Sequence, residues 1–200
     1  MNRSIRRALP ALLVLLTTNH VLLAADPSPS LRFEKEIKAY EAADEKNPPP
    51  EGAILFTGAS GIRLWVSLQA DFPEHKVINR GFGGCHMADV VYYADRIVTP
   101  YKPKLIVAQA GGNDINGGKT PQQVLADFQT LVDKVRAKLP ETRIAFLSMS
   151  PSPARWSQVE QQREGNRLVK EFVDKAQNLD YIELFDAFVG AEASRARSYS

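Results

Sequence analysis

The chain has 200 residues, which is enough for one domain with a sizeable buried core. Hydrophobic residues make up 44% of the sequence and charged residues 24%, proportions that exclude a disordered, collagen-like or coiled-coil protein. The formal net charge is +2, but Arg3, Arg6 and Arg7 lie within the first 25 residues, where no acidic residue occurs. The rest carries 22 basic and 23 acidic side chains, a balance that argues against a partner such as nucleic acid or an anionic membrane.

The first 25 residues have the pattern of an export signal. Arginines precede an apolar run over residues 8–16, and the small residues Ala24 and Ala25 fit a cleavage after Ala25. The run is too short to span a hydrocarbon core of ~30 Å, and no cysteine stands at the cut. We therefore predict a signal peptide over residues 1–25 and a periplasmic or secreted protein without stable membrane insertion. Cys85 is the single cysteine, so no intramolecular disulfide is possible.

Residues 26–52 are predicted to form an N-terminal helix followed by a proline-rich linker. The helical pattern runs from Leu31 to Ala43 and places Phe33, Ile37 and Tyr40 on one stripe. Three consecutive prolines then end the helix, because proline lacks the backbone N–H that a continuing helix needs.

The remaining residues, 53–200, are predicted to form one α/β domain. A helix is expected from Pro121 to Leu139, where Thr120 and Gln123 suit a capping box, and another at about residues 158–177. Such alternation of strands and helices implies a parallel sheet with helices on both faces, a three-layer α/β/α arrangement. The five predicted strands cover residues 53–57, 76–79, 105–110, 144–148 and 181–185.

Three of these strand ends are rich in glycine, serine and asparagine. Ligands bind at the carboxyl ends of the strands in open parallel sheets, so the three turns should face one site. Ser60 follows the first strand and places a hydroxyl near a helix N-terminus, which favours developing negative charge. The turn at Gly84 offers a backbone N–H, and Asn113 offers a side-chain amide. Together these groups suit a nucleophile with an oxyanion hole for acyl transfer.

With these residues the chain resembles the SGNH (GDSL-like) hydrolases over residues 51–185, a family of esterases, lipases and carbohydrate deacetylases. The resemblance implies a flavodoxin-like sheet of about five strands and an ester hydrolase that needs no cofactor. Gly58, Ala59 and Ser60 correspond to the first family block, Gly-Asp-Ser, and Ser60 is the implied nucleophile. Ala59 replaces the usual aspartate, which one branch of secreted esterases often lacks.

The second and third family blocks imply the oxyanion donors. Residues 79–84 match the second block, which makes the Gly84 N–H one implied donor. Residues 111–114 match the Gly-x-Asn-Asp block, which makes the Asn113 amide the other. The implied substrate is a small ester or an acylated carbohydrate.

The Asp-x-x-His block of the family, which supplies the general base, has no counterpart in the sequence. No histidine follows His86, and residues 186–200 end without the motif, so we expect a chain truncated before this block and impaired in hydrolysis. His75 precedes the second strand and is predicted at the opposite edge of the sheet. His86 is at the correct edge, but its backbone belongs to the glycine-rich turn. Cys85 is a second candidate nucleophile, although a buried inert thiol is the favoured interpretation.

Two other functions stay open at this point. One is a non-catalytic pseudo-esterase that binds a ligand in the same cleft, and the other is a flavodoxin-like binder of phosphate or nucleotide. Taken singly, each block is also compatible with a tight turn or a helix cap, whereas their order after three strands favours the hydrolase. Trp65, Phe72 and Trp156 are predicted to pack rather than to bind substrate. No cluster of histidine, cysteine and aspartate has the spacing of metal ligands.

Overall fold

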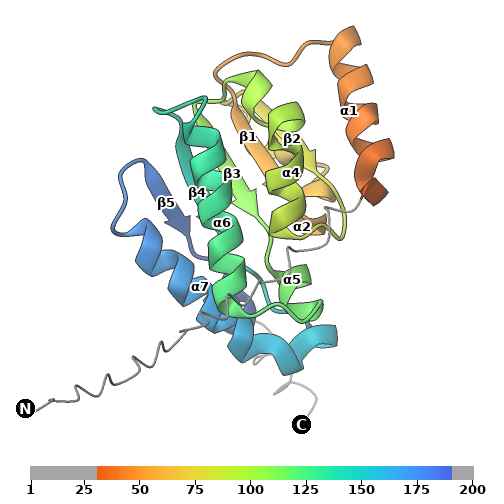
Figure 1. The fold of residues 1–200 in the computed structure, drawn as a ribbon. Coiled ribbons are helices and arrows are strands. Elements are labelled where there is room, and N and C mark those ends of the chain that lie inside the picture. Colours follow the sequence, from red (N-terminus) through yellow and green to blue (C-terminus); the bar gives the residue numbers. More distant parts are fainter. Residues whose placement is uncertain (1–30, 191–200) are drawn as a thin grey trace, which may run out of the picture.

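The computed structural model describes residues 31–190; the predicted signal peptide and its cleavage site lie outside this range. A single parallel sheet has the strand order β2-β1-β3-β4-β5, which is the order of flavodoxin-like doubly wound sheets (Figure 1). The predicted fold class is therefore confirmed. The strands are β1 (Ile54–Gly58), β2 (Val77–Gly81), β3 (Leu105–Gln109), β4 (Arg143–Leu147) and β5 (Leu179–Ile182).

Helices follow every strand. The predicted capping box begins α6, where the Thr120 side chain accepts from Gln123 N and the Gln123 side chain accepts from Thr120 N. Beyond β5, residues 185–190 are helical. The α-helices are α1 (Glu34–Lys46), α2 (Ser60–Arg63), α3 (Leu68–Asp71), α4 (Met87–Ile97), α5 (Gly112–Asn116), α6 (Pro121–Arg136) and α7 (Val159–Val173); short 3₁₀ helices are η1 (Leu31–Phe33), η2 (Thr99–Tyr101) and η3 (Pro153–Gln158).

The last strand differs from its prediction. β5 begins at Leu179 and ends at Ile182, whereas the apolar run had suggested residues 181–185. The hydroxyl of Ser148 accepts hydrogen bonds from the N–H groups of Leu184 and Phe185 at 2.9 and 3.1 Å. These donors bond to a side chain instead of a neighbouring strand, so the backbone turns into the following helix.

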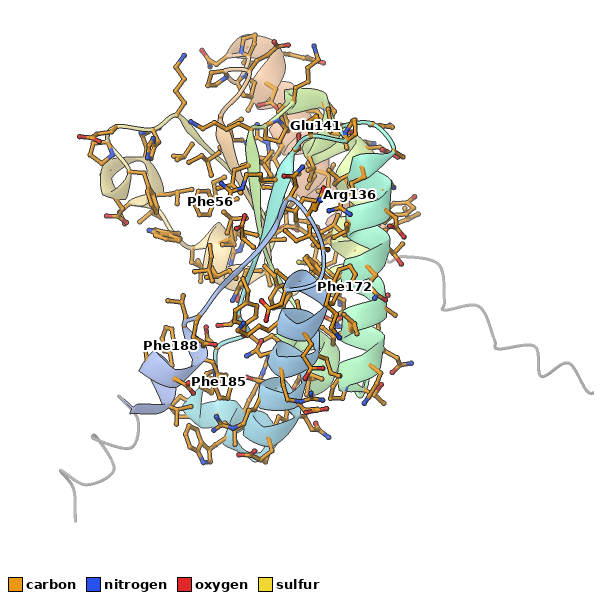
Figure 2. All side chains as sticks on the ribbon, turned by 90° about the vertical axis from the view of Figure 1, so that its left-hand side faces the viewer. Phe56, Arg136, Glu141, Phe172, Phe185 and Phe188 are labelled. Carbon is orange, nitrogen blue, oxygen red and sulfur yellow. The ribbon has the colours of Figure 1, made fainter. Side chains whose placement is uncertain are left out.

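The larger hydrophobic cluster lies between one face of the sheet and the long helices α4, α6 and α7 (Figures 1 and 2). Phe128 of α6 packs edge-on against Phe146 of β4 with 5.0 Å between ring centroids. Phe33 and Ile37 bring the N-terminal segment into the same cluster, and both side chains are buried. The stripe predicted from the sequence therefore marks the face of α1 that packs on the domain.

A smaller cluster covers the opposite face, on the side to which Phe56 projects in Figure 2. Its cover consists of the two four-residue helices α2 and α3 and the chain near them. Phe56 of β1 contacts Trp65 and Phe72 at centroid distances of 5.7 and 5.6 Å, so these two side chains pack as predicted. Trp156 is 42% exposed, and the packing expected for it is wrong.

Arg80 of β2 fixes α1 against the edge of the sheet. Its guanidinium lies 4.8 Å from the ring centroids of both Tyr40 and Tyr101, between the two aromatic side chains. It also donates to Asp44 of α1 and to the hydroxyl of Tyr101. These contacts form the α1 clamp, a set of four residues in which Arg80 and Tyr101 are buried and Asp44 and Tyr40 are half-buried. Across residues 31–190, no helix has the length and apolar character needed to cross a membrane.

Candidate active site

The three turns singled out from the sequence lie side by side because their strands are neighbours. Gly58 at the end of β1 is in register with Gly81 of β2 on one side and with Gln109 of β3 on the other. The three turns, which contain Ser60, Gly84 and Asn113, therefore lie at the same edge of the sheet, as predicted.

The first turn requires glycine at its base. Gly58 has a φ of +132°, and a Cβ there would lie 1.9 Å from the carbonyl oxygen of Gln109 on the next strand. This close approach lets Ala59 N donate to the same carbonyl at 2.9 Å and directs the chain into α2. Ser60 is the first residue of α2 and is exposed to solvent.

Asn79 holds this turn against the second one. Its Nδ2 donates to the carbonyl of Ile62 in α2 at 2.7 Å, and its Oδ1 accepts from Gly81 N at 2.9 Å. One carboxamide thus ties the helix that begins with Ser60 to the end of β2. The asparagine of the second block has a structural role in this chain.

The second turn places Gly84 in the left-handed region, with a φ of +82° and an exposed backbone. Its carbonyl accepts a hydrogen bond from Arg32 at 2.9 Å, so the segment before α1 contacts this loop. The next residue, Cys85, is buried, and that burial raises the pKa of its thiol. A thiol held protonated is a poor nucleophile, which supports the prediction of an inert cysteine.

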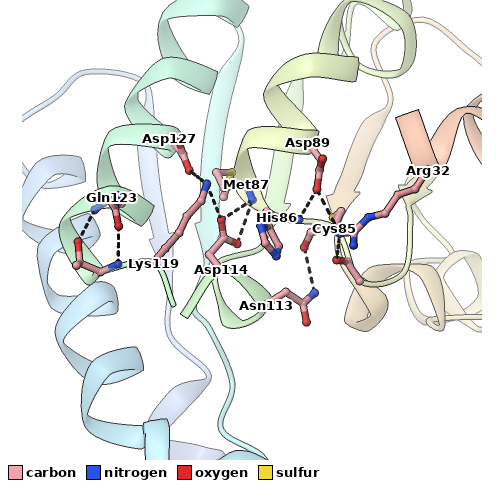
Figure 3. A network of polar contacts seen from close by, with 12 residues as sticks. Arg32, Cys85, His86, Met87, Asp89, Asn113, Asp114, Lys119, Gln123 and Asp127 are labelled. Atoms are coloured by element: carbon pink, nitrogen blue, oxygen red, sulfur yellow. Dashed lines mark hydrogen bonds and ion pairs between the residues drawn. The ribbon is translucent and has the colours of Figure 1, made fainter. Parts of the chain in front are cut away.

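The side-chain amide of Asn113, in the third turn, joins the second turn to η3. Its Nδ2 donates to the carbonyl of Cys85 at 3.0 Å, as Figure 3 shows, and its Oδ1 accepts from Arg155 Nη1 at 2.9 Å. An Asn amide carries two N–H groups, so one of them stays available to a ligand. Both contacts fix the orientation of the carboxamide plane.

Ser60 and Asn113 line one pocket of about 440 Å³, so the structure brings these two predicted residues together. Gly84 is not among the lining residues, but it adjoins Cys85, whose carbonyl Asn113 binds. The catalytic roles of all three stay predictions. The pocket is lined by Ala59, Ser60, Gly61, Gln109, Ala110, Gly112, Asn113, Met149, Ser150, Pro151, Ser152, Arg155 and Phe188.

Several lining residues were missed by sequence reasoning. Gln109 ends β3 and residues 149–152 follow β4, whereas Arg155 lies farther along the chain, in η3. The signal that could have found Gln109 and residues 149–152 is their position, because they lie at carboxyl ends of central strands like the three predicted turns. Their residue types match no family block, so that position was the one available clue.

Asp114, beside Asn113, connects the third turn to α4 (Figure 3). Both of its carboxylate oxygens accept from Met87 N at 3.1 Å, which caps the first turn of α4, and Lys119 Nζ lies 3.5 Å away. The side chain is fully buried, and this burial raises the pKa of the carboxyl against the opposing charges of His86 and Lys119. The helix-cap interpretation thus holds for Asp114.

Neither histidine within residues 31–190 lines the pocket. His75 is exposed and precedes β2, at the opposite edge as predicted. His86 is the N-cap of α4, where its backbone N–H donates to Asp89 Oδ2 at 2.8 Å and its carbonyl accepts from Asp89 N at 3.1 Å. In the same part of the chain, no three histidine, cysteine, aspartate or glutamate side chains are grouped as a metal site.

Solved structures share this fold at low sequence identity. A protein from Streptococcus pneumonia provisionally described as a platelet activating factor has a TM-score of 0.68 and 20% identity, over 78% of this chain and 77% of its own. A GDSL-like lipase from Bacteroides thetaiotaomicron has a TM-score of 0.60 and 20% identity, over 72% and 76%. An acetylxylan esterase from Geobacillus stearothermophilus has a TM-score of 0.57 and 17% identity, over 72% and 81%.

The sequence itself carries a family match. No curated protein sequence matches the chain at a significant level. The family model of GDSL-like lipases and acylhydrolases matches residues 52–200, a range that contains every strand of the sheet and the residues that line the pocket. The chain therefore belongs to the GDSL-like lipase/acylhydrolase family.

Proposed function

We propose that the protein is a serine esterase of the SGNH type that hydrolyses a small ester or an acylated carbohydrate. The observation that carries the proposal is the single pocket shared by the Ser60 hydroxyl and the Asn113 amide. Ser60 Oγ would attack the ester carbonyl carbon, and the alcohol would leave with the proton. The Asn113 amide and the Gly84 N–H would stabilise the oxyanion, and water would then release the acyl group from Ser60.

The pocket has no histidine among its described lining residues to act as general base. Within residues 31–190, neither His75 nor His86 lines the pocket. Removing the histidine of a serine-histidine-aspartate unit lowers kcat on the order of 10⁶-fold, and oxyanion stabilisation with binding retains about 10³–10⁴ over water. We therefore expect slow hydrolysis by this chain.

Free imidazole provides a direct test, because it can replace a missing base when the pocket is open to solvent. We expect hydrolysis of p-nitrophenyl acetate to rise with imidazole concentration in the wild-type chain, above the rate of imidazole alone. Ser60→Ala should abolish that excess. Ser67→Ala is the matched control, since Ser67 is also exposed but bonds to Asp71 outside the pocket.

Equal rates for the wild-type chain and Ser60→Ala at every imidazole concentration would overturn the esterase proposal. If a fluorophosphonate probe also labels both proteins equally, Ser60 is not an activated nucleophile. Ligand binding without any turnover dependent on Ser60 would instead identify a non-catalytic binding protein.

The lining residues support a small polar substrate. Gln109, Ser150 and Ser152 bring hydrogen-bonding side chains to the pocket, and its volume of about 440 Å³ suits a short acyl group with part of a sugar. The structural neighbour from Geobacillus stearothermophilus is an acetylxylan esterase. We expect acetylated xylo-oligosaccharides to give a higher Ser60-dependent kcat/KM than p-nitrophenyl octanoate. A preference for the octanoate would contradict this substrate class.

We further propose that the protein is exported, on the evidence of the arginines and apolar run in residues 1–25. Expression of the full chain in a Gram-negative host should give periplasmic or secreted protein whose sequence begins near Asp26. Recovery of protein that begins at Met1 in the cytoplasm alone would contradict export.

A further inference from the structure

Arg155 is a positively charged residue that lines the pocket. It lies in η3, where its φ of −126° and ψ of 27° interrupt the helical backbone and its N–H donates to the Ser152 carbonyl at 3.0 Å. Its Nη1 donates to Asn113 Oδ1 at 2.9 Å. Gln158, also in η3, donates to Asn116 Oδ1 at 3.0 Å. Two bonds between η3 and α5 therefore hold the guanidinium beside the proposed oxyanion donor.

The charge of Arg155 has no counter-ion in the described part of the chain. It is the one charged residue among those that line the pocket, and its side chain donates to a neutral amide, that of Asn113. The arginines of the adjacent helix α7 behave differently, because Arg163 and Arg167 each pair with glutamates of their own helix. A half-buried guanidinium with unused donors favours an anionic ligand, above all a planar carboxylate that can accept two of its N–H groups.

We propose that the substrate is an ester that carries a carboxylate close to the scissile carbonyl, and that Arg155 binds this carboxylate. The ester part of this inference rests on the proposed function, but the anion site is independent of turnover. Because Arg155 bonds directly to Asn113, the bound carboxylate lies within a few bonds of the carbonyl that Ser60 attacks. The carboxylate belongs to either the acyl group or the alcohol, and both arrangements share the same recognition chemistry.

Binding of stable amide analogues tests the anion site without any need for catalysis. The alcohol-side pair is 4-acetamidobenzoate and its neutral amide, 4-acetamidobenzamide, and the acyl-side pair is N-methylsuccinamate and N-methylsuccinamide. Titration calorimetry of the full chain should give a carboxylate preference of about tenfold in at least one pair. The pair with the larger ratio identifies which side of the ester carries the charge.

Two substitutions separate charge recognition from a structural role. Arg155→Gln should abolish the carboxylate preference while the neutral analogue still binds, and Arg155→Lys should keep part of it. Arg163→Gln is the control, since it removes a neighbouring cation that does not line the pocket. It should leave the preference unchanged. Thermal unfolding of each variant establishes that it is folded.

Equal affinities for carboxylate and neutral amide in both pairs would overturn the proposal, as would an equal loss of both ligands in Arg155→Gln. The latter result would mean that Arg155 acts through the fold or through Asn113. Either result would leave the imidazole and Ser60→Ala experiment intact, so failure of the anion site is distinguishable from failure of the esterase.

Discussion

The carboxamide of Asn113 is held at both ends, because one N–H donates to Cys85 O and its oxygen accepts from Arg155. Its remaining N–H can serve an oxyanion without any reorganisation, which is the condition for effective electrostatic catalysis. Asn113→Ala should therefore lower the Ser60-dependent kcat about 10²–10³-fold in imidazole, with a smaller effect on KM. Asn116→Ala, which removes the amide that Gln158 binds, is the control and should change kcat little.

Asp114 predicts a specific dependence of stability on pH. Burial raises the pKa of its carboxyl, so the folded state binds this proton more tightly than the unfolded chain does. The free energy of unfolding should therefore fall as the pH rises from about 3.9, the value of an unperturbed aspartate, through the raised pKa of the folded state. Asp114→Asn cannot titrate and should remove this part of the fall.

Urea unfolding of the wild-type chain and Asp114→Asn between about pH 4 and pH 8 measures the difference in slope. Asp133→Asn, on the exposed side of α6, is the matched control and should follow the wild type. A wild-type stability that rises relative to Asp114→Asn over this window would contradict the assignment.

At the scale of secondary structure, the attachment of α1 to the sheet depends on a polar contact. In the α1 clamp, the side chains of Arg80 and Asp44 are 10% and 19% exposed, so removal of one charge leaves the other largely buried without its partner. Arg80→Met should lower the free energy of unfolding by about 3 kcal/mol. Arg143→Met is the control, because Arg143 and its partner Asp180 are 60% and 37% exposed. It should cost less than about 1 kcal/mol, as measured by urea unfolding.

The elements that could be predicted are those whose sequence signal is a regular apolar period or a cap formed by neighbouring residues. The apolar stripe from Val124 to Val135 and the capping box at Thr120 are both encoded in consecutive residues, and α6 was predicted nearly to its ends. The short helices α2, α3 and α5 have too few residues for a period and form because tertiary contacts hold them. β5 ends at Ile182, before the predicted residue 185, because Ser148, more than 30 residues away in sequence, accepts the N–H groups that would have extended the strand.

At the scale of the whole molecule, the two faces of the sheet are covered unequally. Phe128 is fully buried beneath the long helices, whereas Phe72 is partly buried beneath the short ones on the other face. Phe128→Ala should therefore lower the free energy of unfolding by about 4 kcal/mol, and Phe72→Ala by roughly half of that. Urea unfolding of both variants measures the contrast, and equal losses would indicate that the two faces contribute alike.

The candidate site was predictable as far as strand order determines it. Ser60 and Asn113 were assigned to one site because the carboxyl ends of parallel strands share an edge, and they do line one pocket. Arg155 could not be assigned in this way, because its place beside Asn113 results from the path of the chain after β4. The roles of Asp114 and Asn79 were hidden for the same reason, since their partners come from other turns.

The position of α1 bears on how the protein should be produced. The family match begins at residue 52, and a gene trimmed to that boundary would lack α1 altogether. Arg80 would lose Asp44 and the ring of Tyr40, while Arg96 would lose Glu34 and Glu41. Two cations and the apolar surface beneath Ile37 would then face water, and the shortened polypeptide should be prone to aggregate. A gene that starts upstream of residue 31 retains α1 and these contacts.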